Sequence, residues 1–221
     1  MKWYRWLVLP LVLALAAGLA YTVLSLPGQA QALHGAVSDQ LDKSGVTNPV
    51  TAVLLNFRGY DTLLEMVVLL LALLGVQSLG AQPAVRTESH PGPGPVLDAL
   101  TRLLVPVLVL VAAYFLWIGA HAPGGAFQAG AVLGAAGVLW ILTSERIEHD
   151  LARLPLRIAV TAGVATFFTI AVLTLHTGRR LLEYPPAQAG SLILLIETVA
   201  TVSIGVTLAT LFLGTGPKDG E

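Results

Sequence analysis

The stretch GSLILLIETVATVSIGVTLATLFL, residues 190–213, contains one charged residue, Glu197, among apolar and small side chains. A helix needs an apolar run of this length to cross the ~30 Å hydrocarbon layer of a membrane. Five further runs of this kind lie N-terminal to it, each bounded by polar, charged or Pro/Gly-rich residues. The predicted spans are 6–26, 62–79, 98–119, 126–142, 158–175 and 190–213. The sequence therefore predicts an all-α integral membrane protein of about six transmembrane helices.

The composition agrees with this prediction and excludes several classes of protein. Of 221 residues, 55% are hydrophobic and 11% are charged, whereas globular domains carry about 25% charged residues. The chain has no cysteine, which excludes disulfides, thiolate metal sites and cysteine nucleophiles. The five histidines are scattered without metal-binding spacing, and the net charge of −1 gives no reason to expect nucleic acid. We therefore predict no enzyme, no cofactor and no metal site.

The segments between the spans predict the domain organisation. Residues 34–46 are polar and are predicted as a loop or an interfacial segment. Asn48 and Pro49 fit an N-cap and a first helical position, and they predict a short amphipathic helix at the membrane interface, ending at 58–61. The linker 81–95 is rich in Pro and Gly. The predicted domains are a two-helix module at 1–80, the linker 81–95, a four-helix module at 96–213 and a polar tail at 214–221.

The distribution of Lys and Arg predicts the orientation in the membrane. With the N-terminus in the cytoplasm, eight of these residues lie on the inner side and four on the outer side. Both termini are therefore predicted to be cytoplasmic. The first apolar run has two interpretations, a retained anchor or a cleaved signal peptide ending near 29–32. We favour the anchor, because the run is longer than the 7–15 residues of a usual signal-peptide core.

Glu197 is the first candidate for a functional side chain. It lies roughly 10 Å below the start of its predicted helix, where an ionised carboxylate costs about 2.5–3.5 kcal/mol or more. Thr201 and Gly205 lie on the same face at helical spacing. One interpretation is a protonatable or cation-binding group on an ion pathway. The other is a neutral glutamic acid hydrogen-bonded to a neighbouring helix.

Asp61 and Glu65 form a second candidate site, because their i, i+4 spacing places them on one face of the predicted second helix. Arg58 precedes Asp61 by three residues. These residues are candidates for an ion pathway at the outer end of the helix. The alternative is a pair of N-terminal acids favoured by the helix dipole, which explains Asp61 better than Glu65.

His121 and the glycines that follow it mark a chain reversal. A histidine at a membrane boundary can relay protons, because its unperturbed pKa is about 6.5; the alternative is an ordinary turn residue. Gly124 and Gly125 permit unusual backbone angles and are also predicted to pack closely against a neighbouring helix. Gly130 and Gly134 form a GxxxG pattern, which predicts close packing against another helix.

The reversal also carries a family resemblance. The sequence GAHAPGGAFQAG at 119–130 resembles the GHxxPGGGFxGG signature of the MnhB/MrpB-like subunits of Mrp-type multisubunit sodium/proton antiporters. The resemblance extends over residues 96–213. It departs from the signature at Ala126 and Ala129, where glycine is usual, and at Ala120, which is inserted between the glycine and the histidine.

A second resemblance covers the N-terminal module. The sequence NPVTAVLLNFRGYDTLLE at 48–65 is similar to a segment in the C-terminal extension of the large A-type antiporter subunit, and to a small separate MbhE-like subunit of membrane-bound hydrogenase complexes. Asn56 replaces a usual aspartate and Leu64 a usual glycine. The linker at 81–95 then joins two family modules.

Together the resemblances imply a membrane subunit of an Mrp-like antiporter module. The implied partners are other antiporter subunits, including the large ones, together with the lipid bilayer, H⁺ and Na⁺, in a bacterial or archaeal inner membrane. Glu65 is the position that the resemblance best supports as part of an ion path. Two alternatives stay open: a purely structural bridging subunit of a larger ion-driven complex, and a stand-alone carrier, for which no internal repeat is visible.

Overall fold

The computed structural model describes residues 4–25, 33–78, 94–143 and 154–214. Most of the predicted linker at 81–95 and of the polar tail at 214–221 lies outside these residues, as do residues 144–153 and the possible cleavage site at 29–32. The chain divides into two compact units, Met1–Ala36 and Val37–Glu221. The first unit contains helix α1, Tyr4–Leu24, which corresponds to the first predicted span and passes through Pro10. Its stretch Leu9–Leu24 is an apolar helix.

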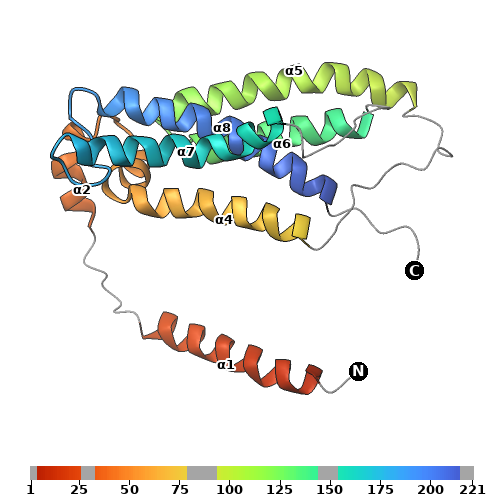
Figure 1. Cartoon of the computed structure of the whole chain (residues 1–221), viewed down its shortest axis with the longest axis horizontal. Helices are drawn as coiled ribbons and strands as arrows, with labels where there is room; N and C mark the ends of the chain where they lie inside the picture. The colour runs from red at the N-terminus through yellow and green to blue at the C-terminus, as the bar shows by residue number, and fades with distance from the viewer. Residues whose placement is uncertain (1–3, 26–32, 79–93, 144–153, 215–221) are drawn as a thin grey trace. The chain divides into compact units, whose positions relative to one another are not determined.

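The described part of the second unit is built around five long helices, which run alongside one another (Figure 1). All five are long and apolar enough to cross a membrane. The described residues contain no strand, so the prediction of an all-α membrane protein is confirmed. The five helices are α4 Gly59–Ser78, α5 Pro95–Ile118, α6 Ala126–Thr143, α7 Leu154–His176 and α8 Ala189–Gly214.

Helix α8 is the centre of this unit, because it packs against α6, α7 and α4, while α5 packs mainly on α6. More of its span is buried than of any other of the five helices. Two clusters of buried side chains surround it. One joins it to α7 through Phe167 and Ile193, and the other joins it to α4 and α6 through Met66, Ala126 and Ile204.

A group of short helical segments lies at one end of the five-helix bundle (Figure 1). Residues 34–46 contain helix α2, His34–Gln40, and a 3₁₀ turn, Leu41–Lys43, so the prediction of a loop was wrong in part. The buried Ser44 hydroxyl ends this segment by donating to the Leu41 carbonyl at 2.6 Å. The predicted cap is confirmed, because the Asn48 side chain accepts a hydrogen bond from the Val50 N–H at 3.1 Å.

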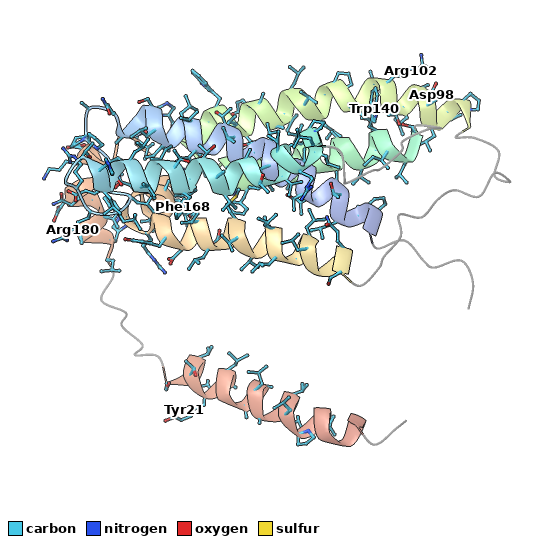
Figure 2. All side chains as sticks on the ribbon, viewed as in Figure 1. Tyr21, Asp98, Arg102, Trp140, Phe168 and Arg180 are labelled. Atoms are coloured by element: carbon cyan, nitrogen blue, oxygen red, sulfur yellow. The ribbon has the colours of Figure 1, made fainter. Side chains whose placement is uncertain are left out.

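The helix that Asn48 caps is continuous with the bundle. Helix α3, Pro49–Ala52, passes into a π-helical turn, Val53–Phe57, and α4 begins two residues later. Thr51, Ala52 and Leu55 are buried, so this short helix packs one side against the protein. Charged side chains mark both ends of the bundle. Figure 2 shows Asp98 and Arg102 at one end and Arg180 at the other.

Candidate functional site

The carboxylate of Glu197 is buried inside the bundle. The residue is 3% exposed, and it lies on α8 within the region that packs against α6. An ionisable group in such a place is costly unless other groups stabilise its charge. The surroundings of its two oxygens therefore decide what the residue can do.

One of these oxygens lies against the N-terminus of α6. The Ala126 N–H donates a hydrogen bond to the Glu197 carboxylate. The first N–H groups of a helix have no partner within that helix and carry a partial positive charge, so a carboxylate there is favourable. Oε2, by contrast, has no hydrogen-bond partner among the described residues. Glu197 thus caps α6 from a neighbouring helix with one oxygen and keeps one acceptor free.

Gly125 makes this approach possible. Its φ is +107°, a conformation that side chains rarely adopt, and a Cβ added to it would lie 2.7 Å from Glu197 Oε1. Its N–H donates to the Phe115 carbonyl at 2.8 Å, which fixes the turn onto the end of α5. A Cβ on Gly124 would lie 2.6 Å from the same carbonyl. The two glycines therefore shape the turn rather than a helix–helix contact.

Residues from the N-terminal module also bind this turn. The Asn48 amide donates to the carbonyls of Gly119, at 3.1 Å, and Ala122, at 2.8 Å. The Thr51 hydroxyl donates to the Gly119 carbonyl at 2.6 Å. Sequence reasoning identified Asn48 only as a cap and gave no role to Thr51. Nothing in the local sequence pairs either residue with a turn about 70 positions away.

His121 lies on the exposed side of the same turn. Its Nδ1 shares a hydrogen bond with the Thr47 hydroxyl at 3.0 Å. The side chain is exposed, and no hydrogen bond joins it to Glu197. The structure therefore places His121 in the contact between the turn and the N-terminal module.

No hydrogen bond or ion pair joins the acids of α4, Asp61 and Glu65, to Glu197. Asp61 forms an ion pair with Arg58 at 2.5 Å, and Glu65 lies one helical turn further along. Glu65 is exposed, whereas Thr62 and Met66 beside it are buried. No hydrogen bond or ion pair joins Glu65 to another described residue. The structure thus brings Arg58 and Asp61 together and leaves Glu65 on an open face of the helix.

Gly130 and Gly134 lie on the face of α6 that packs against α8. A Cβ on Gly130 would lie 2.7 Å from Ile204 Cγ2, and one on Gly134 would lie 3.1 Å from Leu208 Cβ. Larger side chains at these positions would separate the helices. The two glycines keep α6, and with it the N-terminus that Glu197 caps, close to α8.

Tyr184 is a further buried polar group that sequence reasoning missed. It lies in the segment between α7 and α8 and is 4% exposed, and its hydroxyl has no hydrogen-bond partner among the described residues. Burial raises the pKa of the Tyr184 phenol. The described residues contain no group of three or more His, Cys, Asp or Glu side chains arranged to hold a metal ion.

The fold and these sites define a multi-pass, all-helical membrane protein with polar groups buried between its helices. A family model described as a domain related to the MnhB subunit of Na⁺/H⁺ antiporters matches residues 96–214. A second model, for MbhE, a subunit of MBH, matches residues 4–90. The chain therefore belongs to the family of MnhB-related antiporter subunits. It carries this module fused to a segment like the C-terminal part of the A-type subunit, as the resemblances predict.

Known proteins support this membership. A probable K⁺/H⁺ antiporter A/B subunit from Rhizobium meliloti strain 1021 is 28% identical over 206 residues, covering 75% of this chain and 21% of the relative. The chain thus spans about a fifth of that protein. Two solved structures share the fold. A chain of an archaeal membrane-bound sulfane sulfur reductase has a TM-score of 0.67 and 24% identity, covering 95% of this chain and 97% of its own length. A chain of the Mrp complex from Dietzia sp. DQ12-45-1b has a TM-score of 0.68 and 22% identity, covering 97% of this chain and 26% of its own length.

Proposed function

We propose that this protein is a subunit of a multisubunit Mrp-like antiporter that exchanges Na⁺ for protons. In this proposal the outer end of α4 contributes Glu65 to an ion path at the boundary with another subunit. The observation that carries the proposal is the exposure of Glu65 on a helix long enough to cross a membrane. An acid facing lipid would cost about 2.5–3.5 kcal/mol or more. A neighbouring subunit or a water-filled path therefore accounts for its position better than lipid does.

The residues around Glu65 support an ionic role. Arg58, which directly precedes α4, forms its ion pair with Asp61 in the first turn of α4, one helical turn before Glu65. Because these charges neutralise each other, the Glu65 carboxylate is left as the uncompensated charge of the group. A cation or a proton arriving from water can then bind Glu65 without displacing an existing partner.

The partners and the location belong to the same proposal. The matching family is named for Na⁺/H⁺ antiporters, and the relative from Rhizobium meliloti is named for K⁺ and H⁺. We propose Na⁺ as the cation and other antiporter subunits, including the large ones, as the partners. The chain would lie in the inner membrane of a bacterium or archaeon, with both termini in the cytoplasm, as the Lys and Arg distribution predicts.

The experiment that tests this proposal is ion flux through the complete assembly in lipid vesicles. Internal pH is followed after a pulse of Na⁺ or of K⁺, for wild type and for Glu65→Gln. Glu183→Gln is the matched control, because Glu183 is an acid outside the described helices. Among the described residues, its carboxylate accepts only from the Arg180 N–H, at 3.0 Å. Co-purification of the other subunits verifies assembly in each variant.

The proposal expects Glu65→Gln to lose Na⁺-driven proton movement while assembling normally, and Glu183→Gln to keep it. If the internal pH changes after a pulse of K⁺ but not after one of Na⁺, the transported cation is K⁺, and the proposed role of Glu65 is unaffected. Full flux in Glu65→Gln would refute the ion path. The second candidate, a bridging subunit without its own ion path, would then hold. One observation favours that alternative: the Ala126 N–H already engages Glu197 as a structural cap.

A further inference from the structure

The turn between α5 and α6 is held by two separate sets of contacts. In the first set, the Glu197 carboxylate of α8 accepts a hydrogen bond from the Ala126 N–H. In the second set, three carbonyls of the turn accept hydrogen bonds from the N-terminal module. The Ala120 carbonyl accepts from the backbone N–H groups of Thr47, at 2.9 Å, and Asn48, at 3.0 Å. The turn thus lies between the buried acid and the residues that lead into α3.

Asn48 is the residue that joins these contacts. Its Oδ1 accepts from the Val50 N–H and caps α3, while its Nδ2 donates to the carbonyls of Gly119 and Ala122. The residue is 5% exposed, so water cannot easily replace these bonds. One amide therefore both starts α3 and fixes the position of the turn.

The direction of the turn follows from these bonds. With the carbonyls of Gly119, Ala120 and Ala122 facing the N-terminal module, the chain reverses through Gly125 at its positive φ. The next N–H group, that of Ala126, then meets Glu197. A change at Asn48 would therefore move the donor that the buried carboxylate uses, although no hydrogen bond joins Asn48 to Glu197.

We propose that Asn48 is a positioning residue for the Glu197 carboxylate, acting through the turn at 119–125. Asn48 also caps α3, and α3 leads through a π-helical turn into α4, which carries Glu65. The turn at 119–125 therefore links this segment to Glu197, the buried acid of α8. The transport consequence of this link rests on the proposed antiporter function. The positional effect on Glu197 does not depend on it.

The test is infrared difference spectroscopy of the complete assembly in lipid vesicles. The carboxyl band of Glu197 is assigned by its loss in Glu197→Gln. Asn48→Asp is the informative variant, because it keeps the acceptor that caps α3, removes the Nδ2 donors and places an oxygen opposite two carbonyl oxygens. Asn56→Asp is the matched control, since the Asn56 amide donates to the Ser44 carbonyl at 3.0 Å and forms no bond to the turn.

The proposal expects Asn48→Asp to shift the Glu197 band and Asn56→Asp to leave it unchanged, with all subunits co-purifying. If Asn48→Asp fails to assemble, Thr51→Val takes its place. This variant removes only the hydroxyl that donates to the Gly119 carbonyl and should shift the band less. An unchanged band in the assembled variant, or an equal shift in Asn56→Asp, would overturn the proposal. Because the measurement follows the Glu197 band and not flux, it is independent of the outcome for Glu65→Gln.

Discussion

Replacing Gly125 by alanine should be among the most damaging small changes in this protein. The residue adopts φ of +107°, and an added Cβ would lie 2.7 Å from Glu197 Oε1. Two penalties therefore coincide: strain in the backbone, and displacement of a buried carboxylate from the N-terminus of α6. We expect the variant to unfold at a clearly lower temperature and to lose the Glu197 cap.

The magnitude follows from these two penalties. A side chain held in a sparsely populated backbone conformation costs about 1–3 kcal/mol. Loss of a hydrogen bond to a charged group costs about 1.5–3 kcal/mol. Their combination lowers the free energy of unfolding by roughly 2.5–6 kcal/mol, which is large compared with the usual effect of a single substitution.

Two other glycines separate the penalties. Gly178 has φ of +76° with nothing within 4 Å of an added Cβ, so Gly178→Ala measures the backbone strain alone. Gly75 lies in α4 with nothing within 4 Å and an ordinary helical backbone, so Gly75→Ala should be neutral or should stabilise by about 0.5–1 kcal/mol. The unfolding temperatures should rank Gly125→Ala lowest, Gly178→Ala next and Gly75→Ala close to wild type.

The assay is thermal unfolding of the purified assembly in detergent, followed by circular dichroism. A double-mutant cycle completes it. In a Glu197→Ala background, Gly125→Ala should cost only the backbone strain, because the displaced carboxylate is absent. Equal costs of Gly125→Ala in the two backgrounds would refute the argument that Gly125 makes room for Glu197.

Three further outcomes are expected. Tyr184→Phe should leave the free energy of unfolding unchanged or raise it by about 1 kcal/mol, because the buried hydroxyl has no partner among the described residues. Burial raises the pKa of the phenol in the folded state, so the wild-type protein loses stability as the pH rises above about 10. Tyr184→Phe should therefore lose less stability than wild type in unfolding curves measured at alkaline pH. Gly130→Ala should lower the free energy of unfolding by about 1–3 kcal/mol, because its Cβ would overpack the contact between α6 and α8. Gly137→Ala should lower it less, because its Cβ would lie 3.1 Å from the nearest atom, compared with 2.7 Å for Gly130. Equal unfolding temperatures of the two variants would contradict this. In this cysteine-free chain, Arg180→Cys should react with an impermeant thiol reagent added to intact cells, and Asp98→Cys only after permeabilisation; the reverse pattern would invert the predicted orientation.

The sequence predicted the helices well because each is encoded locally. Apolar runs bounded by Pro, Gly and charged residues located the spans, and the Asn48–Pro49 pair located the start of α3. The segment 34–46 was harder, because α2 and the 3₁₀ turn are too short to show a clear apolar period. Their end is fixed by the buried Ser44, whose burial depends on neighbours that the local sequence does not reveal.

The candidate site could be predicted only in part. Glu197 was conspicuous because one acid in an apolar span is costly, but its partner is a backbone N–H and has no signature in the sequence. The glycines at 124–125 indicated a turn without indicating what approaches them. The sequence explained Asn48 fully as a helix cap. Its second set of hydrogen bonds, to the turn at 119–125, became visible only in the three-dimensional structure.

Glu197 and Glu65, the two acids within the apolar helices, differ in whether the described residues provide a partner for the carboxylate. Glu197 is buried, and the N-terminus of α6 supplies a donor to one of its oxygens, so much of its cost is met within this chain. Glu65 is exposed and has no hydrogen-bond or ion-pair partner among the described residues. A membrane protein cannot leave such a group against lipid without a large penalty. The fold therefore explains why Glu197 is tolerated, whereas an explanation of Glu65 requires a neighbour, and the face of α4 that carries it is where the rest of the assembly should be sought.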